Sequence, residues 1–70
     1  MSYQASNEEA TTLLELLVSE HSYMYFDKKS PRILKQVRRI ASEYYDEDVS
    51  FQIDLVRDAI LSQGLCEVIE

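Results

Sequence analysis

The segment Ser30–Tyr45, SPRILKQVRRIASEYY, constrains the fold most, because it carries the clearest helical pattern in the chain. The Ser30 hydroxyl suits a helix N-cap, and Pro31 suits the first helical position, where a missing N–H costs nothing. At about 100° per residue, the apolar side chains share an arc of roughly 140°. They are Ile33, Leu34, Val37, Ile40, Ala41, Tyr44 and Tyr45. The sequence therefore predicts an amphipathic helix over residues 31–45.

The opposite face of this helix is basic, and six of the seven Lys and Arg residues lie between positions 28 and 39. Neighbours three and four apart carry like charge, which costs roughly 0.2–0.5 kcal/mol per pair. The repulsion could be offset by the chain's own acids, Glu15, Glu20, Asp27 and Asp46–Asp48. The alternative is an external anion, either nucleic acid or an acidic partner, although charge runs are more often solvated faces. The candidate partner-binding residues of this basic face are Lys28, Lys29, Arg32, Lys35 and Arg39.

A helix is also predicted over residues 7–21. Ser6 and Glu9 match a capping box, in which the serine accepts from the third helical amide and the glutamate reaches back to the cap. The apolar residues that follow recur on one helical face. They are Ala10, Leu13, Leu14, Leu17 and Val18. Residues 1–5, before this helix, are expected to form a loose arm.

Residues 46–49, DEDV, are predicted to form a turn. A further helix is predicted over residues 50–63, with Asp48 or Ser50 as its N-cap and Gly64 as the left-handed residue that stops it. Its apolar residues cover more than half of its circumference, which exceeds what a three-helix core requires. At least one border should stay exposed, with tyrosines near the helix ends as its rim. The candidate apolar contact patch consists of Phe51, Ile53, Leu55, Tyr44 and Tyr45.

Two short apolar segments are ambiguous. Residues 22–26, SYMYF, either extend the first helix or form a strand, because periodicity cannot resolve so short a run. Residues 65–69, LCEVI, form a short strand or a tail on the core. The predicted fold class is mainly α, a compact three-helix domain over 1–70, with short strands at 22–26 and 65–69 as an option. Its expected core is Leu13, Leu14, Leu17, Val37, Ile40, Val56 and Ile60.

Size and charge limit the function classes. A chain of 70 residues buries only about 60% of its unfolded surface, so the core is marginal and a dimer or a tight partner would add to it. The net charge of −6 disfavours non-specific binding to nucleic acid or anionic membranes. No apolar run is long enough to span a membrane, no signal-peptide pattern is present, and the one cysteine has no disulfide partner. We expect a cytoplasmic protein.

No pattern in the sequence indicates catalysis, metal binding or a cofactor. His21 has no second histidine or nearby cysteine at a metal-binding spacing, and Cys66 has no supporting base motif. The run Asp46–Asp48 lacks the glycine and the distal glutamate of a calcium loop, and Gly64 alone cannot build a phosphate-binding loop. We expect no enzyme and no cofactor, and a structural role for His21.

The order of the predicted elements is similar to that of a winged-helix domain. In that family a short strand follows the first helix, as SYMYF does here, and a Gly-Leu strand follows the third, as in VRDAILSQGLCEVIE. The similarity covers about half of the chain and implies a DNA-binding regulator whose third helix enters the major groove. In this sequence that helix carries Asp54 and Asp58, which oppose phosphate, and the basic residues lie on the helix before it.

The leading prediction of function is a small acidic helical module for protein–protein contact, acting as a regulator, an inhibitor or an assembly adaptor. Surplus apolar surface and charge segregation motivate it, and a homodimer is expected. One alternative is a winged-helix-like transcriptional regulator that binds nucleic acid through the basic residues at 28–39. The other is an acidic protein that mimics DNA and inhibits a DNA-binding partner.

Overall fold

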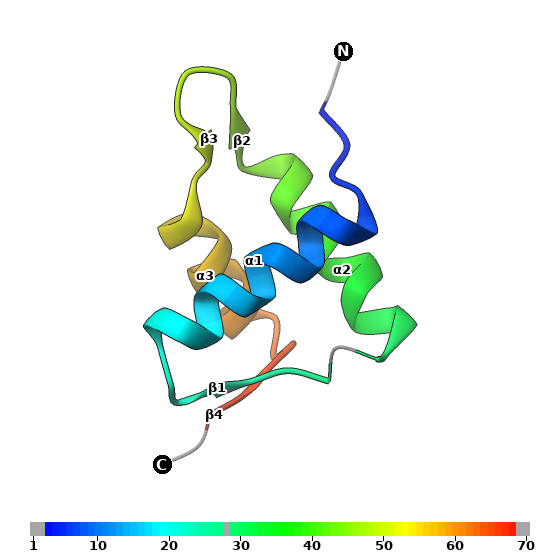
Figure 1. Ribbon diagram of the computed structural model, residues 1–70, viewed down its shortest axis with the longest axis vertical. Coiled ribbons are helices and arrows are strands. Elements are labelled where there is room, and N and C mark those ends of the chain that lie inside the picture. The colour runs from blue at the N-terminus through cyan, green and yellow to red at the C-terminus, as the bar shows by residue number, and fades with distance from the viewer. Residues whose placement is uncertain (1–2, 28, 69–70) are drawn as a thin grey trace.

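The computed structural model describes residues 3–27 and 29–68. Within these ranges the helices are α1 (Asn7–Glu20), α2 (Pro31–Glu43) and α3 (Ile53–Ser62). Two antiparallel pairs of short strands join β1 (Met24–Tyr25) to β4 (Glu67–Val68), and β2 (Tyr45–Asp46) to β3 (Ser50–Phe51). The β1–β4 pair lies at one end of the molecule and the β2–β3 hairpin at the other (Figure 1). The predicted fold class is confirmed, with strands inside 22–26 and 65–69; Ile69 lies outside the described residues.

The first two helices begin at the predicted residues. Ser6 Oγ accepts from the N–H of Glu9 at 3.0 Å, and Glu9 Oε1 accepts from the N–H of Ser6 at 3.0 Å, which completes the capping box. At α2, Ser30 Oγ accepts from the N–H of Ile33 at 3.4 Å, and Pro31 occupies the first helical position. Short-range hydrogen bonding therefore sets both N-termini.

The predicted boundary between the second and third helices is wrong. α2 ends at Glu43, and residues 45–51 form the β2–β3 hairpin. The turn predicted at 46–49 is confirmed, and in it Asp46 Oδ1 accepts from the N–H of Asp48 at 2.8 Å. The turn closes a hairpin, however, and Asp48 does not cap α3. Ser50 lies in β3 with a left-handed φ of 76° and does not cap α3.

Gln52 takes the position at which α3 begins, although its side chain caps no helical amide. Its backbone N–H and its side-chain Nε2 both donate to the carbonyl oxygen of Tyr44, at 3.2 and 3.1 Å. These bonds tie the base of the hairpin to the end of α2. The third helix therefore starts at Ile53, three residues later than predicted.

The end of α3 confirms the predicted role of Gly64, which has a φ of 66°. The Gly64 N–H donates to the carbonyl of Leu61 at 3.2 Å, and the Leu65 N–H donates to that of Ile60 at 3.1 Å. These two bonds are a Schellman motif, in which the residue after the glycine packs back on the helix. Leu65 and Ile60 accordingly share the main core.

Residues 22–26 do not prolong α1, which ends at Glu20. Ser22 and Tyr23 form a turn, and the strand β1 follows at Met24–Tyr25. Met24 and Phe26 are buried, whereas Tyr23 and Tyr25 are exposed. This alternation is the period of two expected of a strand with one face on the core. Pairing with β4 then places Met24 opposite Val68.

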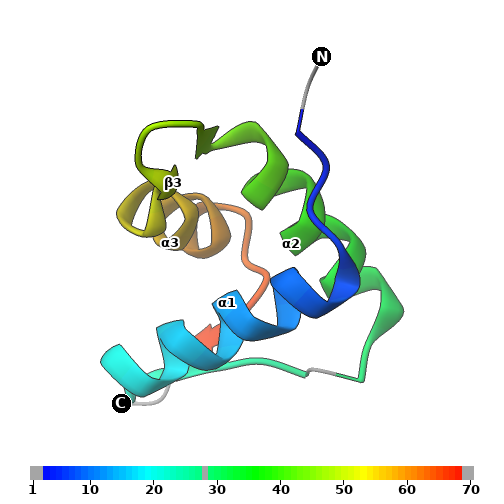
Figure 2. The same cartoon turned by 45° about the horizontal axis from the view of Figure 1, so that its top comes forward.

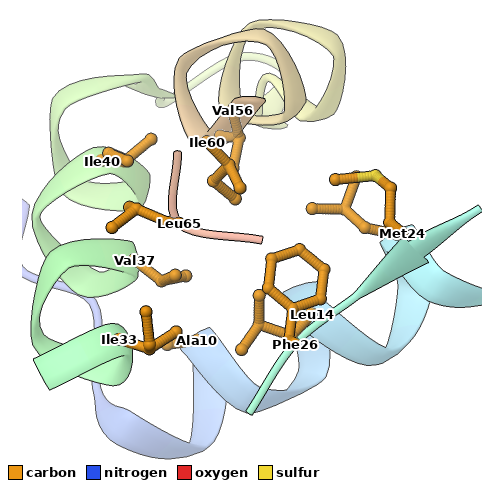
Figure 3. Packing of buried hydrophobic residues seen from close by; sticks show 11 residues of the cluster. Ala10, Leu14, Met24, Phe26, Ile33, Val37, Ile40, Val56, Ile60 and Leu65 are labelled. Atoms are coloured by element: carbon orange, nitrogen blue, oxygen red, sulfur yellow. The ribbon is translucent and has the colours of Figure 1, made fainter. Parts of the chain in front are cut away.

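The main core lies between the three helices and β1, and side chains from all four elements point toward its centre (Figure 3). All seven predicted core residues are buried, but Leu13 belongs to a second, smaller cluster with Ala5 and Ala41. The main cluster also contains residues that the prediction left out: Ala10, Met24, Phe26, Ile33 and Leu65.

The N-terminal arm is ordered from Tyr3 onward, where a loose segment was predicted; Met1 and Ser2 lie outside the described residues. Ala5 is buried, and its N–H donates to Ser42 Oγ of α2 at 2.9 Å. Figure 2 shows the arm running beside α2 before α1 begins. The arm therefore forms one wall of a groove along α2.

Candidate functional site

The outward face of α2 presents three exposed cations, Arg32, Lys35 and Arg39, which we call the basic row. They recur at three- and four-residue spacing, so the helix brings them onto one side as predicted. Lys29 is exposed just upstream, and Lys28 lies outside the described residues. Three of the five residues predicted for the basic face therefore share one side of α2, and a fourth, Lys29, is exposed before the helix begins.

No residue of the basic row forms an ion pair with another residue of the ranges 3–27 and 29–68. The ion pairs that join residues of these ranges both belong to α3, where Arg57 lies 3.7 Å from Asp54 and 3.0 Å from Asp58. The bond to Asp58 raises the pKa of the Arg57 guanidinium. The cation of α3 is therefore neutralised locally, whereas those of the basic row face solvent.

Arg38, next to the basic row, has a structural role that the sequence did not reveal. Its Nε donates to the carbonyl oxygen of Ala5 at 2.9 Å, and its Nη1 lies 3.4 Å from Asn7 Oδ1. Ser42 accepts from the Ala5 N–H and donates from Oγ to the Arg38 carbonyl at 2.7 Å. Both backbone groups of Ala5 are thus bonded to α2, which holds the arm in place.

The arm reaches the hairpin through an aromatic cluster of Tyr3, Tyr45 and Phe51. The Tyr3 and Tyr45 rings are stacked, with centroids 3.9 Å apart and planes 14° apart. Both rings meet Phe51 edge-on, at 5.5 and 5.3 Å. Such pairs add to the stability that their area burial provides.

The Tyr3 hydroxyl also donates a hydrogen bond to Glu9 Oε2. This bond is the main cause that raises the pKa of Tyr3 to about 12, and it likewise lowers the pKa of Glu9. The backbone N–H of Ser6 lowers the Glu9 pKa further. Glu9 therefore connects the arm to the capping box of α1.

An open groove runs along α2 between the arm and the hairpin. Its walls combine the two stacked tyrosines with charges of both signs. The lining residues are Tyr3, Gln4, Ala5, Lys35, Arg38, Arg39, Ser42, Glu43, Tyr45 and Glu47. We call it the α2 groove. It contains two members of the basic row, and Arg32 lies outside it.

The residues of the predicted apolar patch do not form one exposed surface. Leu55 is 44% exposed, whereas the other four are half-buried. Phe51 and Tyr45 belong to the aromatic cluster, and Tyr44 and Ile53 pack against the main core. Of the apolar residues predicted for this patch, Leu55 is therefore the exposed one. Elsewhere on the described chain, large exposed apolar side chains are Leu16, Tyr23, Tyr25 and Val49.

His21 and Cys66 lie apart from the α2 groove. His21 is the C-cap of α1, and its ring centroid is 5.6 Å from that of Tyr23. Cys66 is a half-buried free thiol whose pKa is raised by burial. Across residues 3–27 and 29–68, no three His, Cys, Asp or Glu side chains are grouped so that they could hold a metal ion.

Comparison of the chain with protein-family models, curated proteins and solved structures gives no match. No helix in the described part of the chain is long and apolar enough to cross a membrane. The function is therefore inferred from the surfaces of this molecule alone.

Proposed function

We propose that this chain is a protein–protein interaction module that acts as a regulator, an inhibitor or an assembly adaptor. The observation that carries the proposal is the basic row, whose three exposed cations form no ion pair among the described residues. A row of like charges weakens its own helix, and an anionic surface on a partner would offset that cost. Partner binding therefore accounts for the basic row, whereas the stability of the helix alone does not.

The opposite sign of charge on α3 supports a protein partner. Asp54, Asp58 and Leu55 are exposed there, on the helix that a winged-helix arrangement would place against DNA. Acidic side chains in that position oppose phosphate. A partner protein with separate acidic and basic regions can match both the basic row of α2 and the acidic residues of α3. Such charge complementarity improves the orientation and the specificity of binding.

Self-association and a cytoplasmic setting belong to the same proposal. Exposed Leu55 and a small core favour a homodimer, because a second copy would bury apolar surface that one chain leaves in water. The single free Cys66 suits a reducing compartment, since it forms no internal disulfide among the described residues.

Affinity capture from the native host, with the mass of the recovered complex measured, tests the proposal. We expect the unmodified chain to retain a protein that a triple variant, Arg32→Ala, Lys35→Ala and Arg39→Ala, does not retain. The matched control is Leu16→Ala, an exposed change on α1 that keeps every charge. Equal recovery by all three baits would remove the basic row from the proposal.

Nucleic-acid binding is the second candidate, favoured by the tyrosine rings and cations that share the α2 groove. Such a combination binds single strands by stacking and by charge, and the β1–β4 pairing fits the winged-helix element order. A titration of duplex and single strands against salt decides this case. Tight, salt-sensitive binding whose slope flattens in the triple variant supports it, whereas affinity no better than about 10⁻⁴–10⁻⁶ M at physiological salt rejects it.

A further inference from the structure

The charges in the α2 groove are ordered along the chain. Lys35 and Arg39 come first, one helical turn apart, and Glu43 follows one turn later. Glu47, in the hairpin loop, continues the acidic end. The groove is therefore basic toward the start of α2 and acidic toward its end. At about 1.5 Å per residue, Lys35 and Glu43 stand roughly 12 Å apart along the helix.

These four side chains are exposed and available. Within the described part of the chain, none of them takes part in an ion pair or a side-chain hydrogen bond. Arg39 and Glu43 are four residues apart, which is a spacing that often pairs, yet they do not pair here. Arg57 of α3 shows the contrast, since two aspartates neutralise it.

This arrangement selects among possible occupants. A polyanion would meet Glu43 and Glu47 at one end of the groove, and a polycation would meet Lys35 and Arg39 at the other. A ligand that matches both ends must carry the two signs in the reverse order. A second copy of this chain does so when its α2 lies antiparallel, because a two-fold axis places each surface against itself.

Resting on the proposed function, we propose that the α2 groove is the self-association surface of this protein. Two copies meet with their α2 helices antiparallel, so that Lys35 faces Glu47 of the second copy and Arg39 faces its Glu43. Symmetry repeats each pair, giving four intermolecular contacts between opposite charges. The rings of Tyr3 and Tyr45 line the same groove and supply apolar area beside these contacts.

The wall of the groove is fixed before any partner arrives. Arg38 and Ser42 bond both backbone groups of Ala5, and Tyr3 is stacked and hydrogen-bonded. Little side-chain or loop ordering is then required on association, which improves affinity for a given area. A dimer of ordinary size would bury about 800 Å² on each copy, a moderate share of the 4918 Å² that the chain exposes.

Net charge sets the conditions for a test. Two copies of net charge −6 repel at long range, and physiological salt, with a screening length of about 8 Å, weakens that repulsion more than it weakens charges in contact. We expect association at physiological ionic strength and a loss of association near 1 M salt.

The experiment measures mass against concentration for four proteins, by light scattering and sedimentation equilibrium. They are the unmodified chain, Lys35→Glu, Glu47→Lys and the double variant Lys35→Glu/Glu47→Lys. Each single variant places like charges opposite one another twice per dimer, so the dissociation constant should rise about tenfold or more. The double variant keeps the net charge and restores opposite pairs, so it should recover the original mass. Circular dichroism confirms that each variant is folded.

The control is Lys29→Glu, which changes net charge by the same amount as Lys35→Glu at an exposed position outside the groove. It should associate nearly as the unmodified chain does. A chain that stays monomeric at every concentration overturns the inference, as do single variants that behave like Lys29→Glu or a double variant that fails to recover. A monomeric chain would also remove the homodimer from the proposed function, but each of these results leaves capture of a foreign partner by the basic row intact, so that capture can fail separately.

Discussion

Arg38 donates a hydrogen bond from Nε to the carbonyl oxygen of Ala5 at 2.9 Å, although 33 positions separate the two residues in the sequence. The bond joins a helix in the middle of the chain to an extended segment near its start. Ala5 is 1% exposed, so its carbonyl has little access to water once the arm is in place. Arg38 therefore couples the arm to α2, together with Ser42, which accepts from the Ala5 N–H.

Replacing Arg38 tests this coupling. Arg38→Met keeps a long apolar stem but removes the donor, leaving the Ala5 carbonyl without that bond, and we expect about 1–3 kcal/mol of destabilisation. Urea unfolding measures the change. Arg39→Met is the matched control, because Arg39 is exposed, and it should shift stability by no more than about 0.5 kcal/mol. Equal midpoints for the two variants would contradict the role assigned to Arg38.

The main core predicts opposite outcomes for two adjacent leucines. Leu17 is fully buried, whereas Leu16 is 40% exposed. Leu17→Ala should cost about 2–5 kcal/mol, because it removes buried methyl groups and leaves a cavity. That loss is enough to unfold much of a domain this small at ambient temperature. Leu16→Ala should leave the thermal midpoint nearly unchanged, and a comparable loss in both variants would refute the core assignment.

Two left-handed residues predict opposite signs of stability change. Ser50 has a φ of 76° and Gly64 a φ of 66°. A left-handed φ costs an ordinary side chain about 1–2 kcal/mol, and Ser50→Gly removes this cost. Glycine also raises the conformational entropy of the unfolded chain, which offsets part of the gain, so the variant should be slightly more stable. Gly64→Ala imposes the same strain on the Schellman motif and should destabilise by about 1 kcal/mol. Thermal unfolding of both variants shows whether the signs differ.

The Tyr3–Glu9 hydrogen bond predicts the pH dependence of stability. The pKa of Glu9 is lower in the folded chain, so its contribution is present above the unfolded pKa and is lost as pH falls through the folded value. The pKa of Tyr3 is raised to about 12, so its contribution is complete below the ordinary value of 10.0 and is lost as pH rises toward 12.

Tyr3→Phe keeps the stacked ring and removes the hydroxyl. We expect a flatter dependence of unfolding free energy on pH at both the acidic and the alkaline end. Tyr25→Phe, at an exposed tyrosine in β1, is the control and should follow the unmodified profile. A Tyr3→Phe profile parallel to that of the unmodified chain would contradict the link to Glu9.

The helices were predictable because their information is local. The serine caps at Ser6 and Ser30 and the Gly64 stop act within one turn, and helical periodicity identifies the buried face. The exposed basic row follows from the same periodicity. The secondary structure of residues 22–26 could not be predicted, because so short a segment fits both the helical and the strand period. In the structure, Met24 and Tyr25 form a strand that pairs with β4.

The hairpin and the arm could not be predicted, since both depend on distant partners. The turn at 46–49 was predicted, but the two strands that it joins were not, and their Tyr45 and Phe51 pack against Tyr3 of the arm. The role of Arg38 depends on Ala5, which no pattern marks as buried. The α2 groove, built from arm, helix and hairpin together, was invisible for the same reason.

The pairing of β1 with β4 has a consequence for how the chain folds. Met24 pairs with Val68, and the main core includes Leu65, so both are complete only after the C-terminal residues have joined the structure. More than 40 residues separate Met24 from Val68 in the sequence. Closing so large a loop is slow relative to forming α1 or α2, and an incomplete chain would expose Met24 and Phe26. A nascent polypeptide would therefore reach its native state late, in one cooperative step, and would depend on that step for protection from proteolysis.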